Sequence, residues 1–176
     1  MTRRQLEHLI RACTQIADDE ELIIIGSQAI LGQFPDAPAS LLASVEADVY
    51  PKNHPERADL IDGSIGEGSP FHDTFGYYAQ GVAEATATLP AGWKERLLPV
   101  RNDNTRGSTG WCLEAHDLVV SKLVAGRAKD LLFAEQAVRH GLVTAETLAA
   151  RLRVTPVSDA LRPHVEQRIQ RLATLR

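Results

Sequence analysis

Residues 22–31, LIIIGSQAIL, join four consecutive apolar residues to the dipeptide Gly26-Ser27 and then to a stretch of helical character. The run from Leu22 to Ile25 has the length and β-branched composition of an inner strand of a sheet. The residues from Ser27 to Gln33 predict a short helix. A strand, a Gly-Ser turn and a helix start together present backbone N–H groups that suit a phosphate.

A second strand is predicted by the strict alternation of SVEADVY, residues 44–50, which Pro51 closes. With a period of two, Glu46 and Asp48 share one face of this strand, and Val45, Ala47 and Val49 share the other. Two carboxylates that close repel each other unless a cation or a proton intervenes, and oxygen ligands suit Mg²⁺. The alternative is an edge strand that turns its polar face to water.

The rest of the sequence predicts both helices and strands up to residue 114 and helices only after it. We expect helices over residues 3–19 and 55–67, and short strands over 77–80, 84–88, 96–101 and 111–113. A stretch rich in Gly and Pro lies around residues 66–70. From Ala115 onward the sequence predicts helices only, with Gly126 and Gly141 as C-caps and Thr144 as an N-cap. The expected architecture is an α/β core over residues 1–114, followed by a helical region over 115–176 packed on it.

The charge is unevenly distributed along the chain. The net charge is -4, but the last 26 residues carry six arginines against Asp159 and Glu166. This basic C-terminal tail can attract a phosphate backbone, or it can be the solvated face of a helix. No apolar run is long enough to span a bilayer, and no signal peptide is evident, so we expect a cytoplasmic protein with no membrane partner.

Two stretches of the chain resemble a known family. The pairing of IIIGSQAI with SVEADVY is similar to the Gly-Ser and Asp-x-Asp signature of the nucleotidyltransferase fold, the DNA polymerase β-like superfamily. Further along, HDLVVSKLVAGRAKDLLFAEQ (residues 116–136) resembles a segment of the AbiEii-type nucleotidyltransferases, which include toxins of type IV toxin–antitoxin systems. The resemblance covers roughly residues 20–140. It implies an α+β fold with a mixed sheet, flanking helices and a C-terminal helical region.

The resemblance also implies roles for individual residues. Gly26 and Ser27 would hold the triphosphate of an NTP, and Glu46 and Asp48 would bind Mg²⁺ or Mn²⁺. Lys122 would contact phosphates, and Asp130 would complete the site or orient Lys122. Arg127 and Lys129 would face the nucleotide or the acceptor. Taken without the resemblance, Lys122 and Asp130 are an exposed helix lysine and a helix N-terminal acid.

These expectations lead to two hypotheses about function. The first is an Mg²⁺-dependent enzyme that moves a nucleoside monophosphate from an NTP to an acceptor such as a tRNA 3′ end, as a toxin does. The second is a catalytically silent module with the same fold that binds a cognate toxin or antitoxin protein. The second gains support from Glu46, where the family usually has Asp, and from the lack of a third carboxylate on a following strand. Asp103 falls in an expected loop, and Glu114 lies near a strand end.

Overall fold

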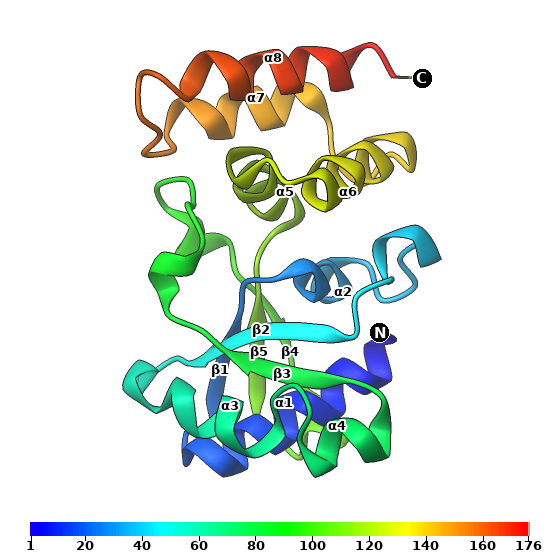
Figure 1. Cartoon of the computed structure of the whole chain (residues 1–176), viewed down its shortest axis with the longest axis vertical. Helices are drawn as coiled ribbons and strands as arrows, with labels where there is room; N and C mark the ends of the chain where they lie inside the picture. The colour runs from blue at the N-terminus through cyan, green and yellow to red at the C-terminus, as the bar shows by residue number, and fades with distance from the viewer. Residues whose placement is uncertain (176) are drawn as a thin grey trace. The chain divides into compact units, whose positions relative to one another are not determined.

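The computed structural model describes residues 1–175, and these form two compact units. The sheet unit comprises Met1–Thr86 and Leu97–Leu113. The helical unit comprises Ala87–Arg96 and Glu114–Arg176. Figure 1 shows the helices and strands of each unit.

The sheet unit is built on a five-stranded mixed sheet in the order β3-β2-β1-β5-β4. Strand β1 pairs antiparallel with β2 and parallel with β5, while β2 runs parallel to β3 and β4 runs antiparallel to β5. The predicted mixed α/β fold is therefore confirmed. The strands are β1 (Glu21–Ile24), β2 (Glu46–Pro51), β3 (Tyr78–Gly81), β4 (Leu98–Val100) and β5 (Thr109–Cys112).

Helices cover both faces of this sheet. Helices α1 (Arg3–Ala17) and α3 (Ala58–Ile65) pack on one face, and the short helix α2 (Ile30–Gln33) lies on the other (Figure 1). The sequence explains α1, because its apolar residues recur at helical spacing and are buried against the sheet. Its start is fixed by a capping box in which the side chains of Thr2 and Gln5 each accept a backbone N–H.

Three segments between residues 55 and 88 differ from the predicted elements. Residues 84–88 alternate like a strand, but Glu84–Thr86 is a 3₁₀ helix with exposed side chains. A strand there would bury neither face and so would gain no stability from packing. After the stretch rich in Gly and Pro, a helix that was not predicted, α4 (Pro70–Phe75), begins at Pro70 with Ser69 as its N-cap. The helix expected over 55–67 divides into the 3₁₀ helix Pro55–Arg57 and α3.

The helical unit contains the four helices that the sequence predicts after Ala115. They are α5 (Ala115–Ala125), α6 (Ala128–Arg139), α7 (Ala145–Arg153) and α8 (Arg162–Ala173). Gly126 adopts a positive φ of 67° and caps α5, and the side chain of Thr144 accepts the Thr147 N–H at the start of α7, as predicted. No helix within residues 1–175 is long and apolar enough to cross a membrane.

Candidate functional site

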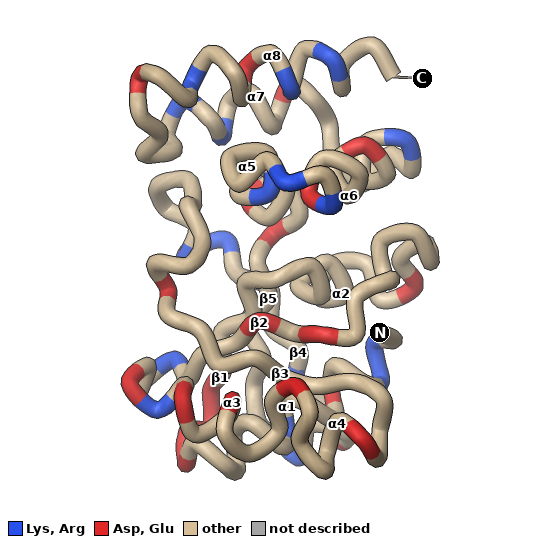
Figure 2. The backbone as a smooth tube through the Cα atoms, viewed as in Figure 1, with Lys and Arg blue, Asp and Glu red and all other residues tan. Residues whose placement is uncertain are grey.

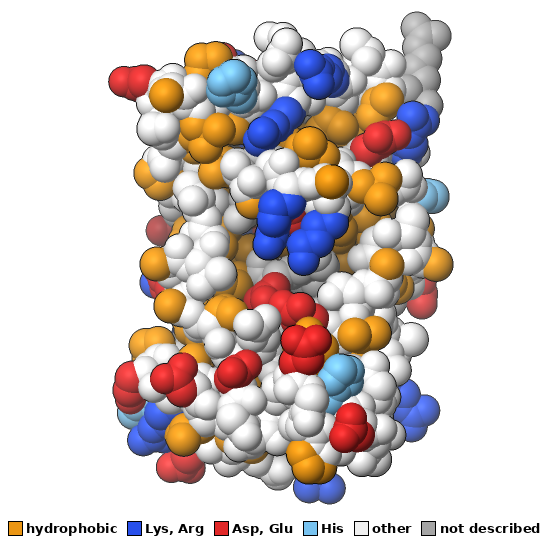
Figure 3. Space-filling model, viewed as in Figure 1, with side chains coloured by type: hydrophobic (Ala, Val, Ile, Leu, Met, Phe, Trp, Pro, Cys, Tyr) orange, Lys and Arg blue, Asp and Glu red, His pale blue; other side chains and the backbone are white. Residues whose placement is uncertain are grey.

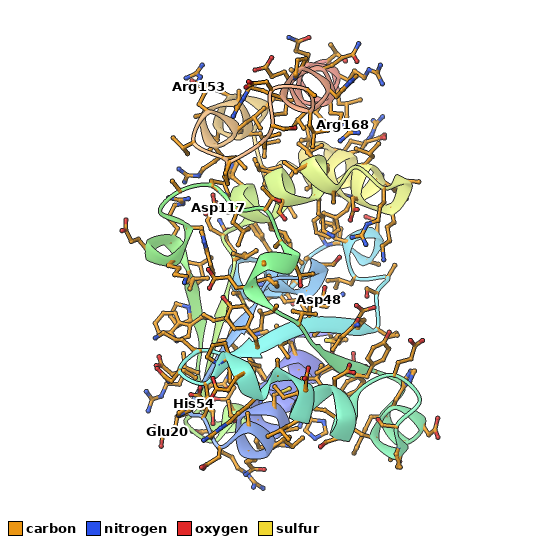
Figure 4. The ribbon with its side chains drawn as sticks, turned by 60° about the vertical axis from the view of Figure 1, so that its left-hand side comes forward. Glu20, Asp48, His54, Asp117, Arg153 and Arg168 are labelled. Atoms are coloured by element: carbon orange, nitrogen blue, oxygen red, sulfur yellow. The ribbon has the colours of Figure 1, made fainter. Side chains whose placement is uncertain are left out.

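The Gly-Ser turn and the acidic strand meet inside the sheet unit. Strand β1 ends at Ile24, and the N–H of Ile25 donates to the carbonyl of Asp48 at 3.0 Å. A Cβ added to Gly26 would lie 2.0 Å from Oδ2 of Asp48. The φ of Gly26 is -84°, which any residue adopts, so glycine is required here for space. The backbone of the turn therefore lies directly against the Asp48 carboxylate (labelled in Figure 4).

The predicted alternation of β2 is present. Ala47 and Val49 are fully buried, whereas Glu46 and Asp48 are half-buried on the opposite face of the strand. The acidic positions of β2 are visible in Figure 2, and Figure 3 shows acidic side chains gathered over this part of the sheet unit. The two carboxylates thus share one face, as expected.

A tyrosine that the sequence analysis did not identify holds the first carboxylate. Tyr78 stands opposite Glu46 in the parallel register of β2 and β3, and its hydroxyl donates to Oε2 of Glu46 at 3.1 Å. Burial, followed by the charge and hydrogen bond of Glu46, raises the pKa of Tyr78 to about 12. The phenol therefore remains a hydrogen-bond donor at neutral pH. The only sequence signal was the strand prediction over 77–80, which did not specify the register.

The turn after Gly26 is tighter than the sequence predicted. Ser27–Ala29 forms a 3₁₀ helix, and only the four residues of α2 follow it as an α-helix. The carbonyl of Gly26 accepts the N–H of Ala29 at 2.9 Å and closes the first turn. So short an element has little macrodipole, and any anion at this turn depends on its backbone N–H groups and the Ser27 hydroxyl.

No third carboxylate accompanies the pair on the neighbouring strand. In β3, Tyr78 and Gln80 occupy the positions opposite Glu46 and Asp48. The two other acids considered from the sequence have different places. Asp103 opens the 3₁₀ helix Asp103–Thr105, and Glu114 is the N-cap of α5, where it accepts the N–H groups of His116 and Asp117. Within residues 1–175 no three acidic, His or Cys side chains gather as a metal-ligating group.

Three of the remaining candidate residues come together within the helical unit. The side chain of Asp130 is fully buried and accepts from Arg127 Nε at 2.6 Å and from Lys122 Nζ at 3.3 Å. Burial alone would raise the pKa of Asp130, but the Arg127 hydrogen bond and the Lys122 and Arg127 charges hold it below its usual value. The Lys122 ammonium also lies 4.7 Å from the centre of the Phe133 ring. Asp130 therefore orients two cations of this unit.

Lys129 stands apart from this group. It is an exposed residue of the first turn of α6, between Ala128 and the buried Asp130. Its position on the helix leaves its ammonium group in solvent. It therefore shares the helix of Asp130 but not the ion-pair cluster.

Several arginines of the basic C-terminal segment support the helical unit. Arg162 donates to the carbonyl of Leu152 in the last turn of α7 and to that of Thr155 just beyond the helix. Arg168 donates to the carbonyl of Leu123 in the last turn of α5. Arg153 and Arg171 are exposed, and Figure 4 labels Arg153 and Arg168. Only part of the segment's positive charge is therefore presented to solvent.

The sequence did not indicate the role of Asp117, a second buried acid of the helical unit. Asp117 has no exposed surface and accepts from Arg96 through Nε at 2.8 Å and Nη2 at 3.1 Å. Arg151 Nε lies 3.0 Å from Oδ1 of Asp117, the oxygen that also accepts Arg96 Nη2. Burial, the largest influence, raises the pKa of Asp117 despite these cations. These ion pairs join residues 87–96 to α5 and α7, and their role is to stabilise the helical unit.

Comparison with known proteins identifies the family of the chain. The profile of a family described as "Nucleotidyltransferase of unknown function (DUF6036)" matches residues 4–163, which is most of the chain. The chain belongs to this nucleotidyltransferase family. The match includes the Gly-Ser turn, the acidic strand and the Lys122–Asp130 segment. No curated protein and no solved structure matches the chain.

Proposed function

We propose that the protein transfers a nucleoside monophosphate from an NTP to an acceptor hydroxyl in an Mg²⁺-dependent reaction. The observation that carries the proposal is the packing of the Gly26 backbone against the Asp48 carboxylate, beside Glu46 on the same strand face. This arrangement provides a place for a phosphate chain next to two metal-binding oxygen donors. Membership of a nucleotidyltransferase family supports the same chemistry.

The donor set fits the cation. Mg²⁺ is commonly held by one or two carboxylates together with substrate phosphates and waters, so Glu46 and Asp48 suffice as its protein ligands. Mn²⁺ prefers the same oxygen donors. When bound, the cation would polarise the α-phosphate and favour the ionised acceptor hydroxyl.

The roles proposed for the chain's own residues rest on the contacts within each unit and on the resemblance of residues 116–136 to AbiEii-type proteins. The N–H groups of the turn and the Ser27 hydroxyl would bind the triphosphate, and Tyr78 would keep the Glu46 carboxylate in place through its hydrogen bond. Lys122, Arg127 and Lys129 would supply positive charge to phosphates of the nucleotide or acceptor. Asp130 would hold the first two of these cations in position. The acceptor hydroxyl attacks the α-phosphorus, and the bond to pyrophosphate breaks.

The acceptor and the biological role extend the proposal. The resemblance of residues 116–136 to AbiEii-type proteins supports a tRNA 3′ end as acceptor and a role as the toxin of a toxin–antitoxin pair. A tRNA would also suit the exposed arginines of the C-terminal segment, such as Arg153 and Arg171. Binding through them should weaken as salt rises, because each phosphate contact releases counterions.

One observation favours a second candidate, a silent module that keeps the fold and binds a partner protein. Strand β3 places Tyr78 and Gln80 beside the acidic pair, where a third carboxylate would be expected in an active enzyme. Such a module would bind nucleotide or a cognate protein without transferring a nucleoside monophosphate.

The deciding experiment is transfer of label to RNA. The protein is incubated with total tRNA, Mg²⁺ and each labelled NTP in turn, and label is sought in the RNA and in the protein. We expect labelling by the wild type and its loss in Asp48→Asn. Asp59→Asn is the matched control, because Asp59 is exposed on α3 and the charge change is the same.

Binding measurements separate the two candidates. Calorimetry with a non-hydrolysable NTP, with and without Mg²⁺, should show Mg²⁺-dependent binding that Glu46→Gln and Asp48→Asn each weaken. Binding of nucleotide or partner without any labelling would assign the silent role. No nucleotide binding under any condition would contradict the enzyme.

A further inference from the structure

The sheet unit contains a second polar site, on the sheet face opposite the acidic pair. A hollow of about 340 Å³ opens beside α1. Helix α1 packs on the face to which β2 turns Ala47 and Val49, whereas Asp48 lies on the other face against Gly26. The residues that line this α1 hollow include Thr2, Arg4, Gln5, His8, Arg11 and Tyr77.

The α1 hollow carries positive charge, and no carboxylate within residues 1–175 forms an ion pair with Arg4 or Arg11. Arg4, His8 and Arg11 recur at intervals of four and three residues and so share one face of the helix. Among residues 1–175, the side chain of Arg4 has no hydrogen-bond or ion-pair partner, and Arg11 donates only to the carbonyl of Asn104, at 2.8 Å. The nearest acid of the helix, Glu7, is already held by Arg3 and two asparagines.

The neutral groups of the α1 hollow are oriented as donors. Burial raises the pKa of the Tyr77 hydroxyl, which lies 2.7 Å from Nδ1 of His8 and shares a hydrogen bond with it. Burial, then the Arg11 charge, lowers the pKa of His8 and favours its neutral ring. In the tautomer with the proton on Nε2, Nδ1 accepts from Tyr77 and Nε2 is left to donate. Gln5 accepts the Thr2 N–H through Oε1 at 2.7 Å, which leaves its amide NH₂ to donate.

We propose that the α1 hollow binds a phosphate group, with Arg4 and Arg11 as charge partners and His8 and Gln5 as neutral donors. Guanidinium groups bind phosphate oxygens in a bidentate manner, and donors on several sides suit a tetrahedral oxyanion. The site is independent of the function proposed above, because none of its residues belongs to the Gly-Ser turn or the acidic pair.

The volume of the α1 hollow indicates that the phosphate is part of a larger ligand. A free phosphate ion would fill only part of about 340 Å³. The ring of Phe75 meets His8 edge to face at 4.9 Å and is 46% exposed, so an aromatic surface borders the site. Aromatic rings beside cationic side chains stack on nucleobases. The phosphate source is therefore either a free nucleotide or the backbone of a single-stranded RNA.

The test is a titration followed by the backbone amide NMR signals of the ¹⁵N-labelled protein. The probes are inorganic phosphate, a nucleoside 5′-monophosphate without metal, and a short single-stranded RNA. We expect saturable shifts at Arg4, Gln5, His8 and Arg11. An RNA that binds more tightly than the mononucleotide, with an affinity that falls with salt, identifies the backbone as the source, whereas equal or weaker binding identifies the free nucleotide.

Single substitutions test whether Arg4 and Arg11 bind the phosphate. Arg4→Gln and Arg11→Gln should each weaken binding about tenfold or more, since each removes a charge-assisted contact. Arg101→Gln is the matched control, with the same charge change at an exposed position of the same unit outside the α1 hollow. Repeating the titration in Asp48→Ala excludes binding at the proposed nucleotide site, because the α1 signals should respond unchanged.

Two outcomes would overturn the proposal. One is wild-type protein that shows no saturable shift at these residues with any of the three probes at millimolar concentration. The other is binding that Arg4→Gln and Arg11→Gln leave unaltered while their circular dichroism matches that of the wild type. Both results are independent of whether the protein transfers nucleotides.

Discussion

Replacing Gly26 with alanine tests the contact on which the proposed site rests. The added Cβ would stand 2.0 Å from Asp48 Oδ2, 2.8 Å from Cγ and 2.9 Å from Cβ. The oxygen must then move by about 1.4 Å to reach the 3.4 Å at which ordinary van der Waals contact begins. The strand cannot slide away, because the Asp48 carbonyl is bonded to the Ile25 N–H. The carboxylate must therefore rotate out of its place.

Gly26→Ala should lower the free energy of unfolding. Overpacking of this kind typically costs about 1–3 kcal/mol. At a compatible backbone conformation, Gly→Ala alone stabilises by roughly 0.4–1 kcal/mol, and the φ of -84° at Gly26 is compatible. We therefore expect a net loss of about 1–2 kcal/mol in the free energy of unfolding, measured by urea denaturation. Labelling of RNA should fall together with it.

A double-mutant cycle isolates the contact. In the Asp48→Ala background the two closest atoms, Oδ2 and Cγ, are removed and the Cβ neighbour at 2.9 Å remains, so the penalty of Gly26→Ala should shrink by about 1 kcal/mol or more. Gly63→Ala is the control, because nothing lies within 4 Å of its added Cβ within α3, and it should stabilise by about 0.5–1 kcal/mol. An equal cost of Gly26→Ala in both backgrounds would refute the reasoning.

Three further predictions concern stability, each measured by urea unfolding. Asp130→Ala should cost about 3–5 kcal/mol, because it leaves the nearly buried ammonium of Lys122 without its carboxylate, and a cost below about 1 kcal/mol would contradict this. Arg168→Met should cost about 1–2 kcal/mol through the lost bond to a carbonyl in the last turn of α5, whereas the exposed Arg171→Met should change little. Burial alone would raise the pKa of Glu7, but its hydrogen bonds hold the pKa below the usual 4.5, so the ionised carboxylate stabilises the fold above pH 4.5 and this stabilisation is lost as the pH falls further. The difference in the free energy of unfolding between wild type and Glu7→Gln should therefore narrow from pH 7 to near pH 3. A difference that stays constant with pH would contradict this prediction.

The sequence predicted those features of the fold that depend on local periodicity. The strands at β1 and β2, the helix α1 and the four helices after Ala115 all follow patterns that one element can show by itself. The strand expected over 84–88 failed because alternation favours a strand only when one face is buried, and Glu84–Thr86 are exposed on all sides. Helix α4 was missed because its six residues are too few to show a helical period.

The candidate site was predictable only in part, for a similar reason. The alternation of residues 44–50 predicted that Glu46 and Asp48 share one face of the strand. The hydrogen bond from Tyr78, however, depends on the register between β2 and β3, which local patterns do not specify. Likewise, the charge of Asp130 was visible in the sequence, whereas its complete burial beside Arg127 is a property of the packed helices.

The role of Gly26 changes once its neighbour is known. A glycine between a strand and a helix suggests a need for unusual backbone angles, yet its φ and ψ are accessible to any residue. What excludes a side chain is the Asp48 carboxylate, 22 residues further along the chain. The turn and the acid therefore constrain each other: a larger residue at position 26 would displace the carboxylate, and displacing the carboxylate would relieve the two closest of the three contacts that exclude a side chain. Gly26 and Asp48 are thus best treated as a single structural feature, which is the reason to mutate them together.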